Sequence, residues 1–88
     1  MDALRLDGNA AAGVLRQVFA MEVTNAGGTC GTCGTMNAVG AVHLYVSAGY
    51  VLRCPHCGDV LMRVVEAGDR MWVDLSGVRS LELPKIDM

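Results

Sequence analysis

The sequence predicts a small α+β domain in which an N-terminal helix packs on an antiparallel β-sheet. Apolar residues recur at three- and four-residue steps between Asp7 and Ala20, whereas alternating apolar and polar residues are frequent from Val39 onward. Two Cys-x-x-Cys-Gly units, at 30–34 and 54–58, indicate a metal site. A metal site would also stabilise a chain of 88 residues, whose small core barely offsets its conformational entropy.

Length and composition exclude several classes of protein. A chain of 88 residues forms at most one domain, so we expect a single domain over 1–88, with a helical segment at 1–23, a cysteine-containing β-region at 24–83 and a tail at 84–88. With 52% hydrophobic and 18% charged residues the chain is too apolar for intrinsic disorder, and no apolar run is long enough to span a membrane. A net charge of -2 and 5% aromatic residues favour neither nucleic acid nor an anionic membrane as a partner.

The expected helix begins near Asp7. Either Asp7 or Asn9 can cap its first turn, because a short side-chain oxygen accepts from an unpaired backbone amide. Gly13 lies inside the helical pattern and marks a possible close approach to the sheet. The N-terminus lacks the basic start and apolar stretch of a secretory signal, so we expect a cytoplasmic protein with reduced thiols.

The cysteines are spaced as zinc ligands. Cys30-Gly31-Thr32-Cys33-Gly34 and Cys54-Pro55-His56-Cys57-Gly58 are separated in the way that four-cysteine zinc sites require. Each glycine suits a tight turn that needs positive φ. We therefore predict that Zn²⁺ is held by Cys30, Cys33, Cys54 and Cys57. Four protein ligands leave no open coordination position, so we expect no enzymatic activity.

Other interpretations of the cysteines stay open. Iron suits four thiolates as zinc does, and a thioredoxin-like dithiol or ordinary buried thiols are further alternatives. His56 lies within the second unit and could replace one sulfur, but we expect it to be exposed because four cysteines complete the coordination. We expect His43 to be half-buried, and Arg53, Arg63, Arg70 and Arg79 to belong to a solvated surface of mixed charge.

The clearest β-hairpin follows the second cysteine unit. Two alternating runs form its strands, and an Ala67-Gly68 turn would place on one face Val60, Met62, Val64, Met71, Val73 and Leu75. This register sets Arg63 across from Trp72 as a cation–π pair. It also sets Glu66 opposite another acid, so a longer loop that pairs Glu66 with Arg70 stays open.

We expect further strands before and after this hairpin, at Val39 to Val46, Tyr50 to Arg53 and Val78 to Leu83. Ser47-Ala48-Gly49 and Ser76-Gly77 form turns, and Pro84 ends the last strand. In the first strand one face carries Val42, Leu44 and Val46.

The two cysteine units resemble the knuckles of zinc ribbons and of rubredoxins. The wider sequence is similar to a small uncharacterised bacterial zinc-ribbon family, a domain of unknown function, through Leu6-Asp7-Gly8-Asn9-Ala10, Val51-Leu52-Arg53-Cys54-Pro55 and Asp69-Arg70-Met71-Trp72-Val73-Asp74-Leu75. This resemblance implies an N-terminal helix attached to a zinc ribbon and carries no activity with it. Rubredoxins have a denser aromatic core than one Trp, one Phe and two Tyr provide.

These observations predict a metal-binding protein, in which a structural zinc ribbon acts as a non-enzymatic interaction or accessory module. The expected partner is a protein, and the sequence does not specify the oligomeric state. The alternative is a rubredoxin-like one-electron carrier with iron at the same cysteines, and a nucleic-acid-binding ribbon ranks third. Four thiolates and one Zn²⁺ would take the formal charge from -2 to about -4, which opposes general binding to nucleic acid.

Overall fold

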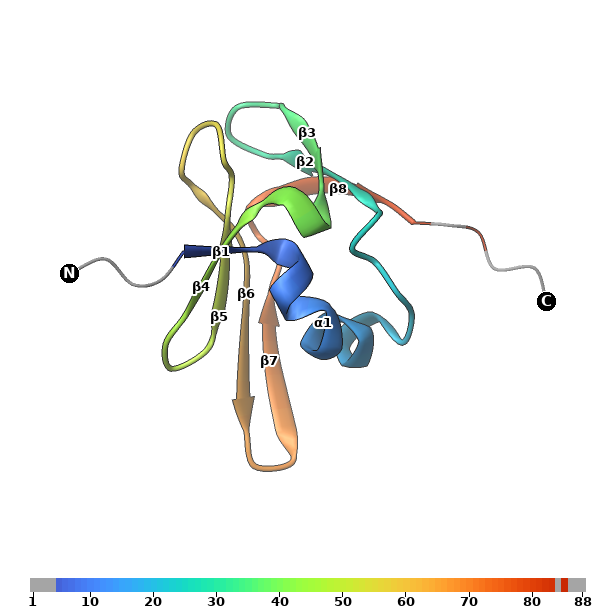
Figure 1. Cartoon of the computed structure of the whole chain (residues 1–88), viewed down its shortest axis with the longest axis vertical. Coiled ribbons are helices and arrows are strands. Elements are labelled where there is room, and N and C mark those ends of the chain that lie inside the picture. The colour runs from blue at the N-terminus through green and yellow to red at the C-terminus, as the bar shows by residue number, and fades with distance from the viewer. Residues whose placement is uncertain (1–4, 84, 86–88) are drawn as a thin grey trace.

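Two antiparallel sheets and one short α-helix make up the part of the chain that the computed structural model describes, residues 5–83 and 85 (Figure 1). The larger sheet has five strands in the order β1-β4-β5-β6-β7, and the smaller has three in the order β3-β2-β8. The prediction of a small α+β protein with antiparallel sheets is confirmed. That residues 1–88 form one domain, divided at 23 and 83, stays a prediction.

The elements follow one another closely along the chain. In order they are β1 (Arg5–Asp7), the 3₁₀ helix η1 (Gly8–Ala11), α1 (Ala12–Phe19), β2 (Gly27–Cys30), β3 (Met36–Ala38), the 3₁₀ helix η2 (Val39–Ala41), β4 (His43–Val46), β5 (Tyr50–Arg53), β6 (Val60–Ala67), β7 (Arg70–Asp74) and β8 (Val78–Glu82).

The N-terminal helix has a different start from the one expected. Asp7 is the last residue of β1 and pairs with His43, and neither Asp7 before η1 nor the residue before α1 makes a side-chain capping bond. The capping prediction is therefore wrong. Asn9 lies inside η1, and its side-chain oxygen packs against Gly40, where a Cβ atom would overlap it. Gly13 does not mark a close approach either, since a Cβ atom there would meet nothing within 4 Å.

The expected strand from Val39 to Val46 begins only at His43. Its first residues form η2 because Val39 donates a backbone hydrogen bond to Ala26 and Gly40 donates one to Thr24, which ties this segment to the loop after α1. The expected apolar face is buried at Val42 and Leu44 but exposed at Val46.

The β6–β7 hairpin is present, but its predicted register is wrong by two residues. Ala67 pairs with Arg70, so the loop is Gly68-Asp69 and not Ala67-Gly68. Gly68 takes the first loop position with φ +62°, a conformation that glycine adopts without cost and alanine does not. The longer-loop alternative is also wrong, because Glu66 pairs with Met71.

The register shift separates the expected cation–π pair. Arg63 lies opposite Asp74, and Trp72 lies opposite Val65. A shift of two residues preserves the side-chain alternation, so Met71 and Val73 stay on the face that Val64 occupies, as predicted.

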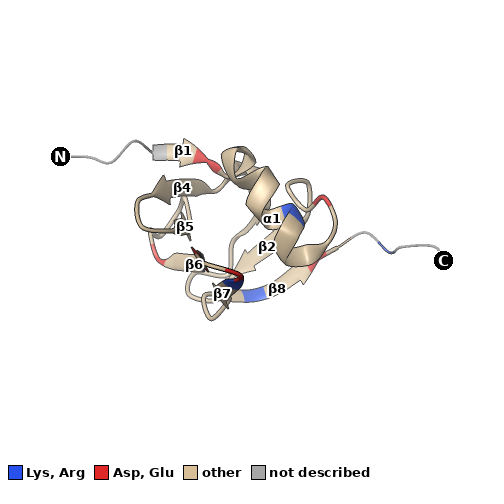
Figure 2. Ribbon diagram, turned by 90° about the horizontal axis from the view of Figure 1, so that it is seen from below, with Lys and Arg blue, Asp and Glu red and all other residues tan. Residues whose placement is uncertain are grey.

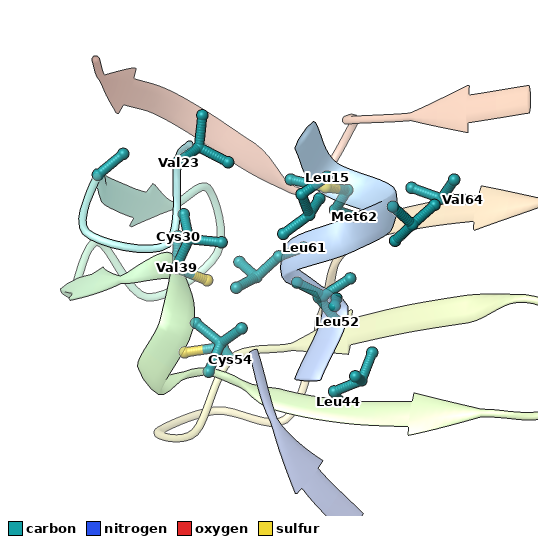
Figure 3. Packing of buried hydrophobic residues seen from close by; sticks show 14 residues of the cluster. Leu15, Val23, Cys30, Val39, Leu44, Leu52, Cys54, Leu61, Met62 and Val64 are labelled. Atoms are coloured by element: carbon teal, nitrogen blue, oxygen red, sulfur yellow. The ribbon is translucent and has the colours of Figure 1, made fainter. Parts of the chain in front are cut away.

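The core lies between the five-stranded sheet, α1 and the three-stranded sheet, and α1 lies to one side of the larger sheet (Figure 2). Its most completely buried side chains are Leu15, Leu44, Leu52, Val23, Val64, Cys30 and Cys54. Figure 3 shows Cys30 and Cys54 at one end of this cluster. The final strand β8 pairs with β2 in the smaller sheet, and the expected stop at Pro84 lies outside the described residues.

Candidate metal centre

The four cysteines come together although they are distant in sequence. The sulfur atoms of Cys30, Cys33, Cys54 and Cys57 all lie within 4.8 Å of one another. The Sγ atoms of Cys30 and Cys57 are 3.7 Å apart, and those of Cys33 and Cys54 are also 3.7 Å apart. Each of these close pairs joins one cysteine unit to the other, so the units face each other across a single site.

The first knuckle folds through three short-range hydrogen bonds. The N–H of Cys30 donates to the carbonyl of Thr35 at 3.0 Å, and the N–H of Gly34 donates back to the carbonyl of Cys30 at 3.0 Å. The N–H of Thr32 is 3.4 Å from the Cys30 Sγ atom and points a donor at that sulfur.

The second knuckle repeats this pattern residue for residue. Cys54 donates its N–H to the carbonyl of Asp59 at 2.9 Å, Gly58 donates to the carbonyl of Cys54 at 2.9 Å, and the N–H of His56 lies 3.4 Å from the Cys54 Sγ atom. Two equivalent loops thus present two sulfurs each to one site.

The glycine after each second cysteine has the backbone angle that the sequence predicted. Gly34 has φ +78° and Gly58 has φ +83°, whereas a residue with a side chain rarely adopts this region. A Cβ atom at either position would meet nothing within 4 Å, so backbone conformation alone and not space requires glycine there.

The sulfur positions fit a tetrahedral metal ion. Two sulfurs bound to zinc at about 2.3 Å and at the tetrahedral angle lie about 3.8 Å apart, close to the spacing of the two pairs across the site. The same spacing is far too long for a disulfide bond, whose sulfurs lie about 2.05 Å apart. All four cysteines are free, so the donor set is four thiols available to one ion.

The knuckles come from different sheets. The first joins β2 to β3 in the three-stranded sheet, and the second joins β5 to β6 in the five-stranded sheet. Both loops lie at the same end of the molecule (Figure 1). An ion held by all four sulfurs would therefore cross-link the two sheets.

Burial differs within each pair of cysteines. Cys30 and Cys54 are 2% and 1% exposed and belong to the hydrophobic core, whereas Cys33 and Cys57 are exposed to solvent. The first cysteine of each unit therefore connects the site to the core, and the second closes the site at the surface.

The surroundings of three of the thiols shift their pKa values in opposite directions. The Thr35 side chain and then its backbone amide lower the pKa of Cys33 to about 6, and the backbone amides of Cys33 and Thr32 lower the pKa of Cys30. The backbone amide of Asp59 lowers the pKa of Cys57, but desolvation and the neighbouring sulfurs together outweigh it and raise that pKa to about 12. Without a cation the cluster thus contains both thiolate and thiol at neutral pH.

Two arginines donate hydrogen bonds to backbone carbonyls of the knuckles, a role that the sequence analysis did not predict. Arg53 donates from Nη1 to the carbonyl of Gly58 at 2.9 Å, and Arg79 donates from Nη2 to the carbonyl of Gly31 at 3.4 Å. Arg53 also lies over the ring of Tyr45, 5.9 Å from its centroid. The position of Arg53 directly before Cys54 was an available signal, whereas Arg79 is remote in sequence from the loop that it contacts.

Other candidate residues lie outside the cluster. His56 is exposed and is not among the grouped ligands, and His43 is half-buried, as expected for both.

Gly77 has an unpredicted role, because its carbonyl accepts from the N–H of Gly31 at 2.9 Å and its own N–H donates to the carbonyl of Leu61 at 3.2 Å. Gly77 thereby connects the first knuckle to β6.

Comparisons with known proteins bear on the identity of the chain. Within residues 5–83 and 85, no helix is long and apolar enough to cross a membrane. Comparison with the curated proteins and with the solved structures yields no match. One family profile matches residues 2–86, almost the whole chain, and the chain therefore belongs to the family of unknown function DUF6510.

Proposed function

We propose that this protein is a zinc-binding module whose metal is structural and whose surface serves a protein partner, without enzymatic activity. The observation that carries the proposal is the placement of two equivalent knuckles, one from each sheet, with their sulfurs at tetrahedral spacing. Cys30, Cys33, Cys54 and Cys57 would be the ligands. When bound, zinc would cross-link the sheets and neutralise part of the thiolate charge.

The proposed absence of enzymatic activity follows from the donor set. Four sulfurs converge on one site, so a tetrahedral ion bound there would have no position left for water or substrate. The four thiols also need a reducing environment to remain available as ligands, which supports the expectation of a cytoplasmic protein.

Energetics favour a structural role for the ion. A structural zinc site contributes about 10–16 kcal/mol in small peptides, whereas a whole domain is stable by only about 5–15 kcal/mol. The described core is small, and two of its most buried side chains are the ligands Cys30 and Cys54. Occupancy of the site would therefore decide whether the chain is folded.

An iron-containing electron carrier is the second candidate, and the exposure of two sulfurs favours it. Cys33 and Cys57 reach the surface, so an ion at the site would lie close enough to solvent to exchange electrons with a partner. A nucleic-acid-binding ribbon remains the third candidate, and affinity for DNA or RNA at low salt would be its signature.

Metal analysis of protein purified from its own host tests these proposals. We expect one zinc ion per chain, colourless protein and a co-purifying protein partner. A red protein that bleaches reversibly on reduction and contains one iron per chain would contradict the structural-zinc proposal and support the electron carrier.

A matched pair of neighbouring substitutions tests the ligand assignment. Cys57→Ala removes an exposed sulfur of the cluster, and His56→Ala removes the exposed side chain before it. We expect Cys57→Ala to lose most of the bound metal and His56→Ala to keep one ion per chain. Equal metal content in the two variants would contradict the assignment.

A further inference from the structure

One edge of the five-stranded sheet is unpaired among the described residues. The strand order ends at β7, and β7 lies at the outer side of the sheet, farthest from β1 (Figure 2). Trp72 in this strand is 69% exposed, and Val73 beside it is 39% exposed. Apolar side chains on an unpaired edge favour pairing with a further strand.

The hairpin determines which backbone groups of β7 are free. The two-residue loop makes Ala67 and Arg70 a hydrogen-bonded pair, and such pairs alternate along an antiparallel ladder. Arg70 and every second residue after it therefore direct their N–H and C=O groups at β6. Met71 and Val73 direct theirs outward, and no other backbone hydrogen bond of the described residues uses these groups.

The sequence of β7, Arg-Met-Trp-Val-Asp, is complementary to itself in the antiparallel direction. A second copy centred on Trp72 sets Arg70 opposite Asp74 of that copy, and the reverse pair forms at the other end. Met71 then lies opposite Val73, so the outward backbone groups of both strands meet as hydrogen-bonded pairs. Trp72 lies opposite its own copy in a non-hydrogen-bonded pair, where cross-strand side chains approach most closely.

We propose that two copies of this chain form a two-fold symmetric dimer by pairing their β7 strands, which joins the two five-stranded sheets into one. An interface on a two-fold axis requires a surface that is complementary to itself, and β7 meets that requirement in charge, apolar contacts and backbone register. The other edge strands are shorter or less complementary. β1 and β3 have three residues each, and β8, which has five, would set Val78 opposite Glu82.

Charge reversal at the strand ends provides a sharp test with the metal-loaded full chain. Arg70→Asp alone or Asp74→Arg alone places like charges opposite each other at both ends of the paired strands. We expect either variant to raise the dimer dissociation constant by about tenfold or more. Sedimentation equilibrium measures this constant, and Arg16→Asp, at an exposed position of α1, is the control for the net-charge change of Arg70→Asp.

Mixing the two single variants should restore association. An Arg70→Asp chain and an Asp74→Arg chain have opposite charges at both ends of the joint, so the mixture should form a heterodimer that neither forms alone. The double variant, which carries both substitutions, should dimerise with itself. Zinc content and melting temperature of each variant establish that the metal centre and the fold are retained.

Hydrogen exchange supplies a second readout. The amides of Met71 and Val73 should exchange more slowly as protein concentration rises, whereas the amide of Trp72, which already faces β6, should not change. A chain that stays monomeric up to millimolar concentration would overturn the proposal. A dimer whose dissociation constant is unaffected by both single charge reversals would also overturn it, because such a dimer would form through another surface.

Discussion

The glycine after the second cysteine of each knuckle is required by backbone conformation. Gly58 has φ +83°, and nothing would crowd a Cβ atom there. Gly58→Ala should lower the free energy of unfolding of the metal-loaded protein by about 1–2 kcal/mol, the usual cost of a left-handed conformation. Chemical denaturation at saturating zinc measures this change.

Gly13 is the matched control for that substitution. Its surroundings are equally open, but its backbone is helical, so Gly13→Ala should raise the free energy of unfolding by about 0.5 kcal/mol through helix propensity. Effects of the same sign in the two variants would show that the conformational argument for Gly58 is wrong.

The separated thiol acidities predict how zinc affinity depends on pH. The pKa of Cys57 is raised to about 12, so this thiol carries a proton at pH 7 that zinc must displace. The pKa of Cys33 is lowered to about 6, so its thiol needs a proton displaced only below that pH. Each displaced proton makes affinity change by about tenfold per pH unit.

Zinc affinity should therefore rise by at least about tenfold per pH unit between pH 6.5 and 7.5, and more steeply between pH 5 and 6. Competition with a chelator of known affinity at each pH measures this slope. An affinity that does not depend on pH would mean that all four sulfurs are already ionised in the metal-free protein.

At the level of the secondary-structure elements, the turn between β7 and β8 holds the first knuckle against β6. A Cβ atom on Gly77 would overlap the carbonyl oxygen of Val60, and the Gly77 backbone bonds both Leu61 and Gly31. Gly77→Ala should destabilise the protein by about 2–3 kcal/mol, because backbone and not a flexible side chain must move. Thermal melting measures this, and an effect as small as that of Gly13→Ala would contradict the assigned role.

The hairpin shows how far an element can be predicted from its own residues. Alternation alone placed Met71 and Val73 on one face, and the structure confirms this, with Met71 packed against the core and Val73 39% exposed. It could not choose between registers that differ by two residues, because both keep that face apolar. The choice depended on the φ angle of Gly68, which favours glycine at the first position of the loop.

For the whole molecule, removal of the metal should abolish the fold. The knuckles belong to different sheets, and the buried ligands Cys30 and Cys54 are part of the shared core, so loss of the ion would release both sheets. We expect a chelator to remove the far-UV circular dichroism signal of the sheets, and we expect added zinc to restore that signal. Unchanged circular dichroism and melting temperature would contradict a structural role for the ion.

The choice of spectroscopic probe matters in that experiment. Trp72 lies in the edge strand β7 and outside the core, so its fluorescence would report on the pairing of β7 with a second copy and not directly on the core. Backbone signals, such as circular dichroism or the exchange of the Leu44 and Val64 amides, report on the buried part of the larger sheet.

The sequence by itself determined the local chemistry of this protein. The knuckles were predictable because their hydrogen bonds join residues no more than five positions apart, from Cys30 to Thr35 and from Cys54 to Asp59. The helix and the core face of the final hairpin were predictable because side-chain periodicity acts over the same short range.

Only the tertiary structure decided how these pieces meet. It assigned the two knuckles to different sheets, paired β8 with β2, and left β7 at the edge of the larger sheet. Pairing between strands distant in sequence depends on which apolar faces can be buried together, and many arrangements satisfy the same alternating pattern. The hydrogen bonds of Arg79 and Gly77 with Gly31 arise from that arrangement, so no local sequence pattern could predict them.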